Sequence, residues 1–314
     1  MVTSCQGSKL NPEEDAMLLT SIFFAFLLGV GQAQPPLMKT EKITIPWAVT
    51  DWEPYYIQEG SNANMGRVDR LRRILEENLK DYQLTDVQAD MPKTIELWKL
   101  DKNICSGSAL MTPEREQLAY FTALSFQVPL EYVLVTARAK VLEGSPPEVS
   151  LKELIKNKMW RGVFVKDRSY GPEIDRLLKD VSARDGHLTL KKSVTDGYTS
   201  LMKMVEKKRF DYMIEYEAVV RAYNEKIFPA KPLLTRAVKE SRPSAIFHLA
   251  CTKNPWGRDV VRKVDQLLQK LALTNEYQRA VESWLEPDLQ KKNRKLLDEF
   301  YQKRAQGPWM TVPQ

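Results

Sequence analysis

Histidine and cysteine are scarce in this chain of 314 residues, which contains two histidines and three cysteines. His187 and His248 lie in unrelated segments, and neither has cysteines or carboxylates at the spacing of a metal site. The sequence also lacks a P-loop, a G-x-G-x-x-G dinucleotide loop and the G-x-S-x-G motif of a serine nucleophile. We therefore expect no metal, no cofactor, no catalytic residue and no enzymatic activity.

The charge of the chain gives no sign of a nucleic-acid partner. Lys and Arg total 47 against 41 Asp and Glu, a net charge of +6, and the two signs are interleaved along the sequence. A basic balance can attract an acidic ligand or an anionic membrane surface, but interleaved charge is more often a solvated surface. We expect a soluble protein that does not bind nucleic acid.

An apolar run of about fifteen residues, 16–30, ends at the small-x-small sequence Gly31-Gln32-Ala33. Its length is typical of a signal peptide and short for a membrane span. Acidic residues precede the run where positive charge is expected, so Met17 is a second candidate for the true start. A buried helix is the alternative, and the absence of amphipathic periodicity disfavours it. We expect residues 1–33 to be a signal peptide and the mature protein to be periplasmic.

The three cysteines leave the question of a disulfide open. Cys5 lies upstream of the apolar run and would be removed with it, which leaves Cys105 and Cys251 in the exported protein. An oxidising compartment permits a disulfide between them. Two free thiols buried on strands are about equally compatible with the sequence, because spacing does not decide the pairing.

Strand-like and helix-like apolar patterns alternate along the chain, which predicts an α/β fold with helices on both faces of the sheets. A turn-rich connection is expected at residues 143–147. The expected strands are residues 43–49, 85–89, 105–110, 132–136, 162–165, 188–191 and 212–216. The expected helices are residues 67–79, 113–118, 151–156, 173–178, 197–207, 259–271, 276–285 and 289–303.

The strongest functional signal lies between Ile104 and Arg138. A strand of small residues is followed by Thr112 and Pro113, which are favoured at the N-cap and first position of a helix. Arg115 follows within the first turn, where a guanidinium beside unpaired backbone N–H groups can bind a carboxylate or phosphate. Taken alone, this pattern is more often a helix start with a solvated arginine.

The order of small-residue strand, T-P-E-R-x-Q helix start, aromatic stretch and long apolar strand resembles the extracytoplasmic solute-binding proteins of the family 3 type. These proteins are the amino-acid receptors of ABC importers. Further similar segments, in the order of that family, span about residues 43–285. They are Trp52-Glu53-Pro54-Tyr55-Tyr56, Gly66-Arg67-Val68-Asp69, the strand at residues 210–217 and the return strand at residues 245–254.

The resemblance implies a two-lobed, periplasmic-binding-protein-like fold of type II. Each lobe would have a central mixed sheet flanked by helices, with the ligand cleft between the lobes. The first lobe would comprise residues 34–138 and 243–314, and the second residues 139–242, with the chain recrossing near residues 242–244. The protein would be a monomer whose partner is an ABC permease or a membrane sensor.

The resemblance also implies ligand-binding residues in the first lobe. Arg115 would clamp a ligand carboxylate at the helix capped by Thr112. Trp52, Tyr55 and Tyr56 would form an aromatic wall that stacks on the ligand or attracts a cationic amine, although packing within their own loop is an equally good interpretation. Asp51 would accept hydrogen bonds from the ligand or cap the following turn. Ser108 would supply a hydroxyl group, because the position where the family often has one is Leu110 here.

In the second lobe the match to the family is looser. The loop with Arg168, Ser169 and Tyr170 would contact the ligand through hydroxyl and backbone N–H groups, and a solvated loop is the alternative. The family's ammonium-binding aspartate corresponds to Tyr216, which lies between Glu215 and Glu217. Either a neighbouring glutamate takes that role, or the ligand is not a standard α-amino acid.

The resulting hypothesis is an exported protein that captures a small polar, carboxylate-bearing ligand by hinge closure for import. Two alternatives stay open. One is a periplasmic sensor or accessory binding subunit. The other is a dehydratase-like enzyme on the same fold, in which Glu215 or Glu217 would be the general acid.

Overall fold

The computed structural model describes residues 41–124, 126, 132–144, 146–181, 187–191, 199–227, 230–241 and 247–307. The predicted signal peptide and the predicted recrossing near residues 242–244 lie outside these ranges. No helix within them combines the length and apolarity that crossing a bilayer requires. The described residues belong to one unit, Glu41–Gln314. Two separate main sheets form within it, and we call the parts of the chain built on them the first and second lobes.

The first lobe is built on a five-stranded mixed sheet of order β2-β1-β3-β11-β4. β1 pairs in parallel with β2 and β3, whereas β11 pairs antiparallel with β3 and β4. The last described strand in sequence, β11, therefore lies inside the sheet, between β3 and β4, which precede it by more than a hundred residues. The strands are β1 (Ile43–Val49), β2 (Tyr82–Gln88), β3 (Cys105–Leu110), β4 (Ala119–Phe121) and β11 (Phe247–Thr252).

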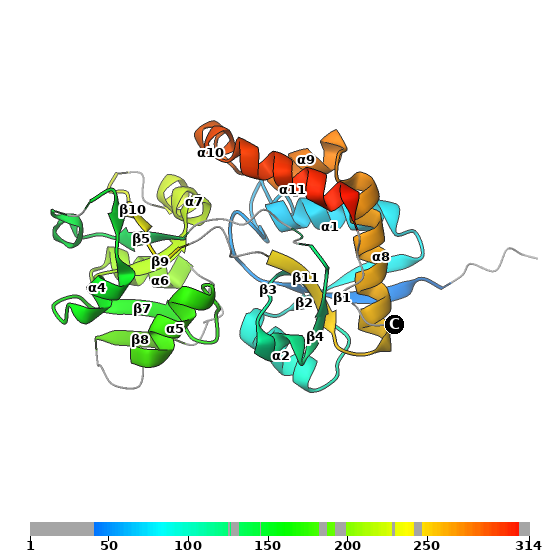
Figure 1. Cartoon of the computed structure of the whole chain (residues 1–314), viewed down its shortest axis with the longest axis horizontal. Coiled ribbons are helices and arrows are strands. Elements are labelled where there is room, and N and C mark those ends of the chain that lie inside the picture. Colours follow the sequence, from blue (N-terminus) through cyan, green and yellow to red (C-terminus); the bar gives the residue numbers. More distant parts are fainter. Residues whose placement is uncertain are drawn as a thin grey trace, which may run out of the picture. The chain divides into compact units, whose positions relative to one another are not determined.

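Two apolar clusters cover the two faces of this sheet. Trp47 and Val49 belong to the larger cluster, whereas Ala48 between them belongs to the smaller one, as expected because successive strand residues point to opposite faces. The helices of the larger side are α1 (Arg67–Asn78), α8 (Pro255–Leu271), α9 (Asn275–Glu282) and α11 (Arg294–Gln306) (Figure 1). The smaller side is covered by α2 (Met91–Lys99), whose Trp98 packs over alanines of the sheet.

The second lobe is built on a four-stranded sheet of order β6-β10-β5-β9. A parallel pair, β7 and β8, joins it through a bridge between Gly162 and Tyr212. The strands are β5 (Tyr132–Thr136), β6 (Glu148–Val149), β7 (Gly162–Val165), β8 (Leu188–Lys191), β9 (Met213–Tyr216) and β10 (Leu234–Val238). The helices are η1 (Ala139–Leu142), α4 (Leu151–Lys156), α5 (Pro172–Val181), α6 (Thr199–Glu206) and α7 (Glu217–Ile227).

The strand β5 lies in the second sheet, where it pairs antiparallel with β9 and β10. The expected end of the first lobe, residue 138, comes after this strand. The chain therefore passes into the second lobe earlier than expected. All five residues of β5 are buried, and an apolar run does not show which sheet it joins. Its partner β10 is about a hundred residues away in sequence. The next described strand after β10, β11, belongs to the first sheet.

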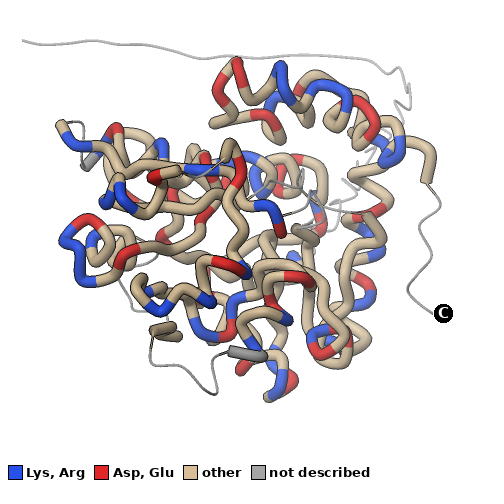
Figure 2. Tube along the Cα trace, turned by 60° about the vertical axis from the view of Figure 1, so that its left-hand side comes forward, with Lys and Arg blue, Asp and Glu red and all other residues tan. Residues whose placement is uncertain are grey.

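The strands β4, β6 and β10 were not expected, and two of the helical regions also differ from the expectation. The single helix expected at residues 289–303 consists of α10 (Pro287–Lys292) and α11, with Asn293 between them. The helix α7, which directly follows β9, was missed because Glu215 and Glu217 were interpreted as candidate site residues at the end of a strand. Charged residues of both signs are interspersed along the trace of both lobes, in agreement with the interleaved charge of the sequence (Figure 2).

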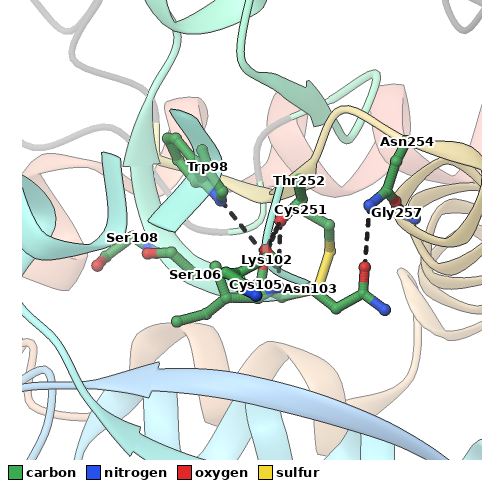
Figure 3. Close-up of a disulfide and its surroundings, with 11 residues drawn as sticks. Trp98, Lys102, Asn103, Cys105, Ser106, Ser108, Cys251, Thr252, Asn254 and Gly257 are labelled. Carbon is green, nitrogen blue, oxygen red and sulfur yellow. Dashed lines mark hydrogen bonds between the residues drawn. A yellow bond between two sulfur atoms is a disulfide. The ribbon is translucent and has the colours of Figure 1, made fainter. Parts of the chain in front are cut away.

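Cys105 and Cys251 form a disulfide between β3 and β11. The two residues are directly opposite in the antiparallel register, with 4.1 Å between their Cα atoms. The neighbouring Thr252 strengthens the same junction, because its hydroxyl accepts a hydrogen bond from the N–H of Ile104 at 3.1 Å and donates to Lys102 O at 2.5 Å (Figure 3). The structure therefore decides the question that the spacing left open: the two chain segments that build the first lobe are joined covalently.

Candidate ligand-binding site

A small cavity of about 30 Å³ lies where residues of the two lobes meet. That volume holds about two water molecules and is too small for an amino acid. The first lobe contributes the ends of β1 and β3 and the loop after β1, and the second lobe contributes β5 and the loop after β7. The lining residues include Thr50, Trp52, Tyr56, Ser106, Ser108, Leu110, Arg115, Tyr132, Arg168, Ser169 and Phe247.

The small residues of β3 shape this inner cavity by alternation. Ser106 and Ser108 line it, and the Ser108 hydroxyl lies 3.3 Å from that of Tyr56. Gly107 between them faces the apolar core, where a Cβ atom would lie only 2.7 Å from Trp47 Cζ2 and 2.8 Å from Val68 Cγ1. Small residues can bring the backbone close to a ligand, but at Gly107 the close neighbours are Trp47 and Val68 of α1.

Arg115 spans the two lobes. It lies in α3 (Pro113–Glu116), whose N-cap Thr112 accepts a hydrogen bond from Arg115 N at 3.3 Å. The buried guanidinium donates to Leu110 O at 3.0 Å in the first lobe and to Asp167 O at 3.1 Å in the second. Because α3 has only four residues, the guanidinium itself, rather than the end of a helix, supplies the positive charge at this place.

Arg168 forms a buried ion pair with Glu215. Two parallel hydrogen bonds join them, from Nη1 to Oε2 at 2.6 Å and from Nη2 to Oε1 at 2.7 Å, and Oε1 also accepts from Tyr216 N at 2.8 Å. The side chains are 6% and 0% exposed. Burial by itself would lower the pKa of Arg168, but the Glu215 carboxylate raises it well above its ordinary value. The pair is therefore bidentate, with the parallel geometry typical of an arginine and a carboxylate.

Four aromatic rings surround the guanidinium of Arg168. Its central carbon lies 4.9 Å from the ring centroid of Tyr170, 5.3 Å from Trp52, 5.4 Å from Tyr132 and 5.5 Å from Tyr216. Tyr132 and Tyr216 are stacked on one another, 4.1 Å apart. We call these four rings the cage around Arg168. Trp52 comes from the first lobe and the three tyrosines from the second, so residues of both lobes form the cage. These distances are those of cation–π contacts.

The remaining expected site residues have different surroundings. Tyr55 is fully buried behind Trp52, with 4.5 Å between their ring centroids, and does not line the cavity. Asp51 is exposed and also lies outside the cavity lining. The hydroxyl of Ser169 donates to Asp175 at 2.5 Å, and that of Tyr170 accepts from Val165 N at 2.8 Å.

A larger cavity of about 490 Å³ adjoins the inner one. Arg115, Arg168 and Ser169 line both cavities and so lie at the boundary between them. Thr112 and Asp175 line the outer cavity but not the inner one. Its volume is within the range of ordinary small-molecule sites, which the inner cavity is not.

No protein-family model matches this sequence, and no curated protein does. Its structure, in contrast, is similar to many solved structures. An ancestral arginine-binding protein bound to arginine has a TM-score of 0.59 at 16% identity, covering 77% of this chain and 98% of that one. A putative L-cystine ABC transporter protein from Listeria monocytogenes has a TM-score of 0.58 at 14% identity, covering 79% and 97%. An arginine-specific periplasmic binding protein from Salmonella typhimurium has a TM-score of 0.57 at 15% identity, covering 78% and 100%.

The fold is that of the type II periplasmic binding proteins. This confirms the expected fold class, with two lobes each built on a sheet flanked by helices. Arg115, Trp52, Ser108 and Ser169, which come from both lobes, are brought together at the inner cavity. The cavity-lining residues that sequence reasoning missed include Tyr132 and Phe247. Both lie in apolar strands, and only the pairing of those strands brings them to the cavity.

Proposed function

We propose that this protein captures a small polar, carboxylate-bearing solute between its lobes and delivers it to an ABC-type importer outside the cytoplasm. The shared fold supports this proposal, because the similar structures include binding proteins of amino-acid ABC transporters. Binding would occur by hinge closure, in which each lobe contributes polar groups to the enclosed solute.

The observation that carries the proposal is the position of Arg115. Its guanidinium touches a main-chain carbonyl from each lobe and lies at the boundary of the outer cavity. A carboxylate that enters the outer cavity can replace carbonyl contacts by a charge-assisted pair with this arginine. The rest of the solute would then occupy the outer cavity of about 490 Å³. A solute held there contacts both lobes and so stabilises their closure.

We propose further that binding occurs without turnover. The dehydratase-like alternative needs a protonated glutamate as general acid. Glu215 is held by two hydrogen bonds from Arg168, and Glu217 pairs with Arg221 one turn further along α7 at 2.8 Å. Both carboxylates are thus engaged by arginine side chains of the protein itself. The sensor alternative would use the same site and differs only in its membrane partner.

A thermal-shift screen of the protein with amino acids and small carboxylic acids tests the proposal, followed by titration calorimetry of any hit. A ligand present at 100 times its Kd raises the free energy of unfolding by about 2.7 kcal/mol. We expect a carboxylate-bearing hit whose binding is lost in Arg115→Ala and kept in Arg258→Ala, which removes an exposed arginine of α8. Hits that bind equally well without Arg115, or that are converted to product, would contradict the proposal.

A further inference from the structure

The cage around Arg168 has the composition of a cation-binding site. It combines four aromatic faces with one carboxylate, the two kinds of group that attract a guanidinium or ammonium ion in a desolvated place. The ion in this site belongs to the chain itself. The cage is also part of the cleft, because Trp52, Tyr132 and Arg168 all line the inner cavity.

The backbone before Arg168 is arranged to deliver its side chain inward. Asp167 has φ = 63°, in the left-handed region that few residues other than glycine adopt, although aspartate tolerates it. Its carbonyl oxygen accepts the hydrogen bond from Arg115. The next residues, Ser169 and Tyr170, are held by Asp175, which accepts from the Ser169 hydroxyl and, at 2.6 Å, from Tyr170 N. The loop is thus anchored on both sides of Arg168.

We propose that Arg168 is a built-in occupant of the cationic compartment of the cleft and thereby determines ligand specificity. It fills the space that a cationic group of a solute would need, and it uses the Glu215 carboxylate that would hold such a group. Cationic solutes are therefore excluded, and the site accepts short anionic solutes that reach Arg115 from the outer cavity. This inference rests on the proposed function as far as it concerns the natural ligand, but the compartment itself can be tested separately.

Removal of Arg168 should turn the compartment into a binding site for added guanidinium compounds. Arg168→Ala leaves the four rings in place and leaves Glu215 without its cation. Ethylguanidinium has the charge and planar shape of the missing group, whereas ethylurea has a similar planar shape and no charge. The double variant Arg168→Ala/Glu215→Gln is the matched control, because it keeps the same space and lacks the carboxylate.

The test is a thermal melt and a calorimetric titration of each protein with ethylguanidinium and ethylurea at millimolar concentration, and of the wild type with arginine and agmatine as well. We expect ethylguanidinium to stabilise Arg168→Ala, with an affinity at least tenfold higher than in the double variant and no response to ethylurea. The wild type should respond to none of these cations. An Arg168→Ala chain that folds only when ethylguanidinium is present would give the same support.

Three results would overturn the inference. One is a wild type that binds arginine or agmatine. Another is a folded Arg168→Ala protein that ethylguanidinium stabilises no more than it stabilises the double variant. The third is an Arg168→Ala chain that ethylguanidinium does not restore to a folded state. Failure of the carboxylate screen on the wild type would reject the proposed function alone, since the cation titration of Arg168→Ala does not depend on it.

Discussion

Asp265 in α8 faces Arg304 in the last helix, α11, with 3.3 Å between Oδ1 and Nη1 and both side chains almost completely buried. The other oxygen, Oδ2, accepts a hydrogen bond from Ala123 N at 2.8 Å. Burial raises the pKa of Asp265 to about 6, although Arg304 acts in the opposite direction. His248 lies in β11. Burial lowers the pKa of His248 to about 4, and its Nδ1 atom lies 2.8 Å from Thr122 O.

These two groups predict opposite dependences of stability on pH. Between about pH 4 and 6 the folded protein binds more protons at Asp265 than the unfolded chain, so this group stabilises less as the pH rises. At His248 the unfolded chain binds more protons between about pH 4 and 6.5, so this group stabilises more as the pH rises. We expect the two effects largely to cancel in the wild type. In Asp265→Asn, the free energy of unfolding should rise more steeply between pH 4 and 6.5.

Urea denaturation at half-unit pH steps measures the slope of the free energy of unfolding against pH. Asp265→Asn also leaves Arg304 without its carboxylate, but the overall loss of stability that this causes does not enter the slope. His248→Asn serves as the converse variant, with a slope that changes toward falling stability. Parallel pH profiles for the wild type and both variants would contradict the assignment.

Reduction of the disulfide should destabilise the first lobe. The bond joins residues separated by 146 positions, and closing a loop of this length in the unfolded chain contributes about 2–5 kcal/mol. Cys251→Ser should lower the melting temperature by a corresponding amount, and dithiothreitol should have the same effect on the wild type. A Cys105→Ser/Cys251→Ser variant is the control, because it cannot respond to the reductant. A wild type that melts identically with and without reductant would count against the disulfide.

Truncation of Arg115 should weaken ligand binding by a factor of about 30 or more, since removing one partner of a buried charge pair typically costs about 2–5 kcal/mol. Arg115→Lys should recover little, because an ammonium group does not reproduce the two-pronged geometry of a guanidinium. In the unliganded protein, loss of the bonds to Leu110 O and Asp167 O should reduce stability by only about 1–3 kcal/mol. Unchanged affinity with a large loss of stability would make Arg115 a purely structural residue.

The Arg168–Glu215 pair should behave as a coupled unit in denaturation experiments. Either Arg168→Ala or Glu215→Ala leaves a buried charge without its partner and should lower the free energy of unfolding by about 3–5 kcal/mol. The double variant Arg168→Met/Glu215→Leu replaces both charges by apolar groups and should lose much less than the sum of the single effects. Strictly additive losses would show that the two side chains do not interact in solution.

Export predicts a defined N-terminus. If residues 1–33 are a signal peptide, the mature chain begins at Gln34, and mass spectrometry of the protein secreted by an expressing cell should give the mass of residues 34–314. A secreted protein that retains residues 17–33 would reject this prediction.

Local sequence by itself determined most of the secondary structure, including the start of the helix that contains Arg115. The N-cap preference of Thr112, the position of Pro113 and the apolar periods of β1, β7 and α1 depend on neighbours within a few residues, so they can be interpreted without knowledge of the fold. The type II fold was predicted from the resemblance of several short motifs, in their order along the chain, to the family 3 solute-binding proteins.

Only the tertiary structure decided which groups meet across long stretches of chain. Glu215 was recognisable as an acidic residue in an apolar strand, but its partner Arg168 lies 47 residues away in a loop whose sequence is equally compatible with full solvation. The pairing of Cys105 with Cys251 likewise depends on the register between β3 and β11. Such contacts arise when separate segments are buried together. A buried charge is stable only beside a partner charge, and two thiols can form a disulfide only where packing places them next to each other.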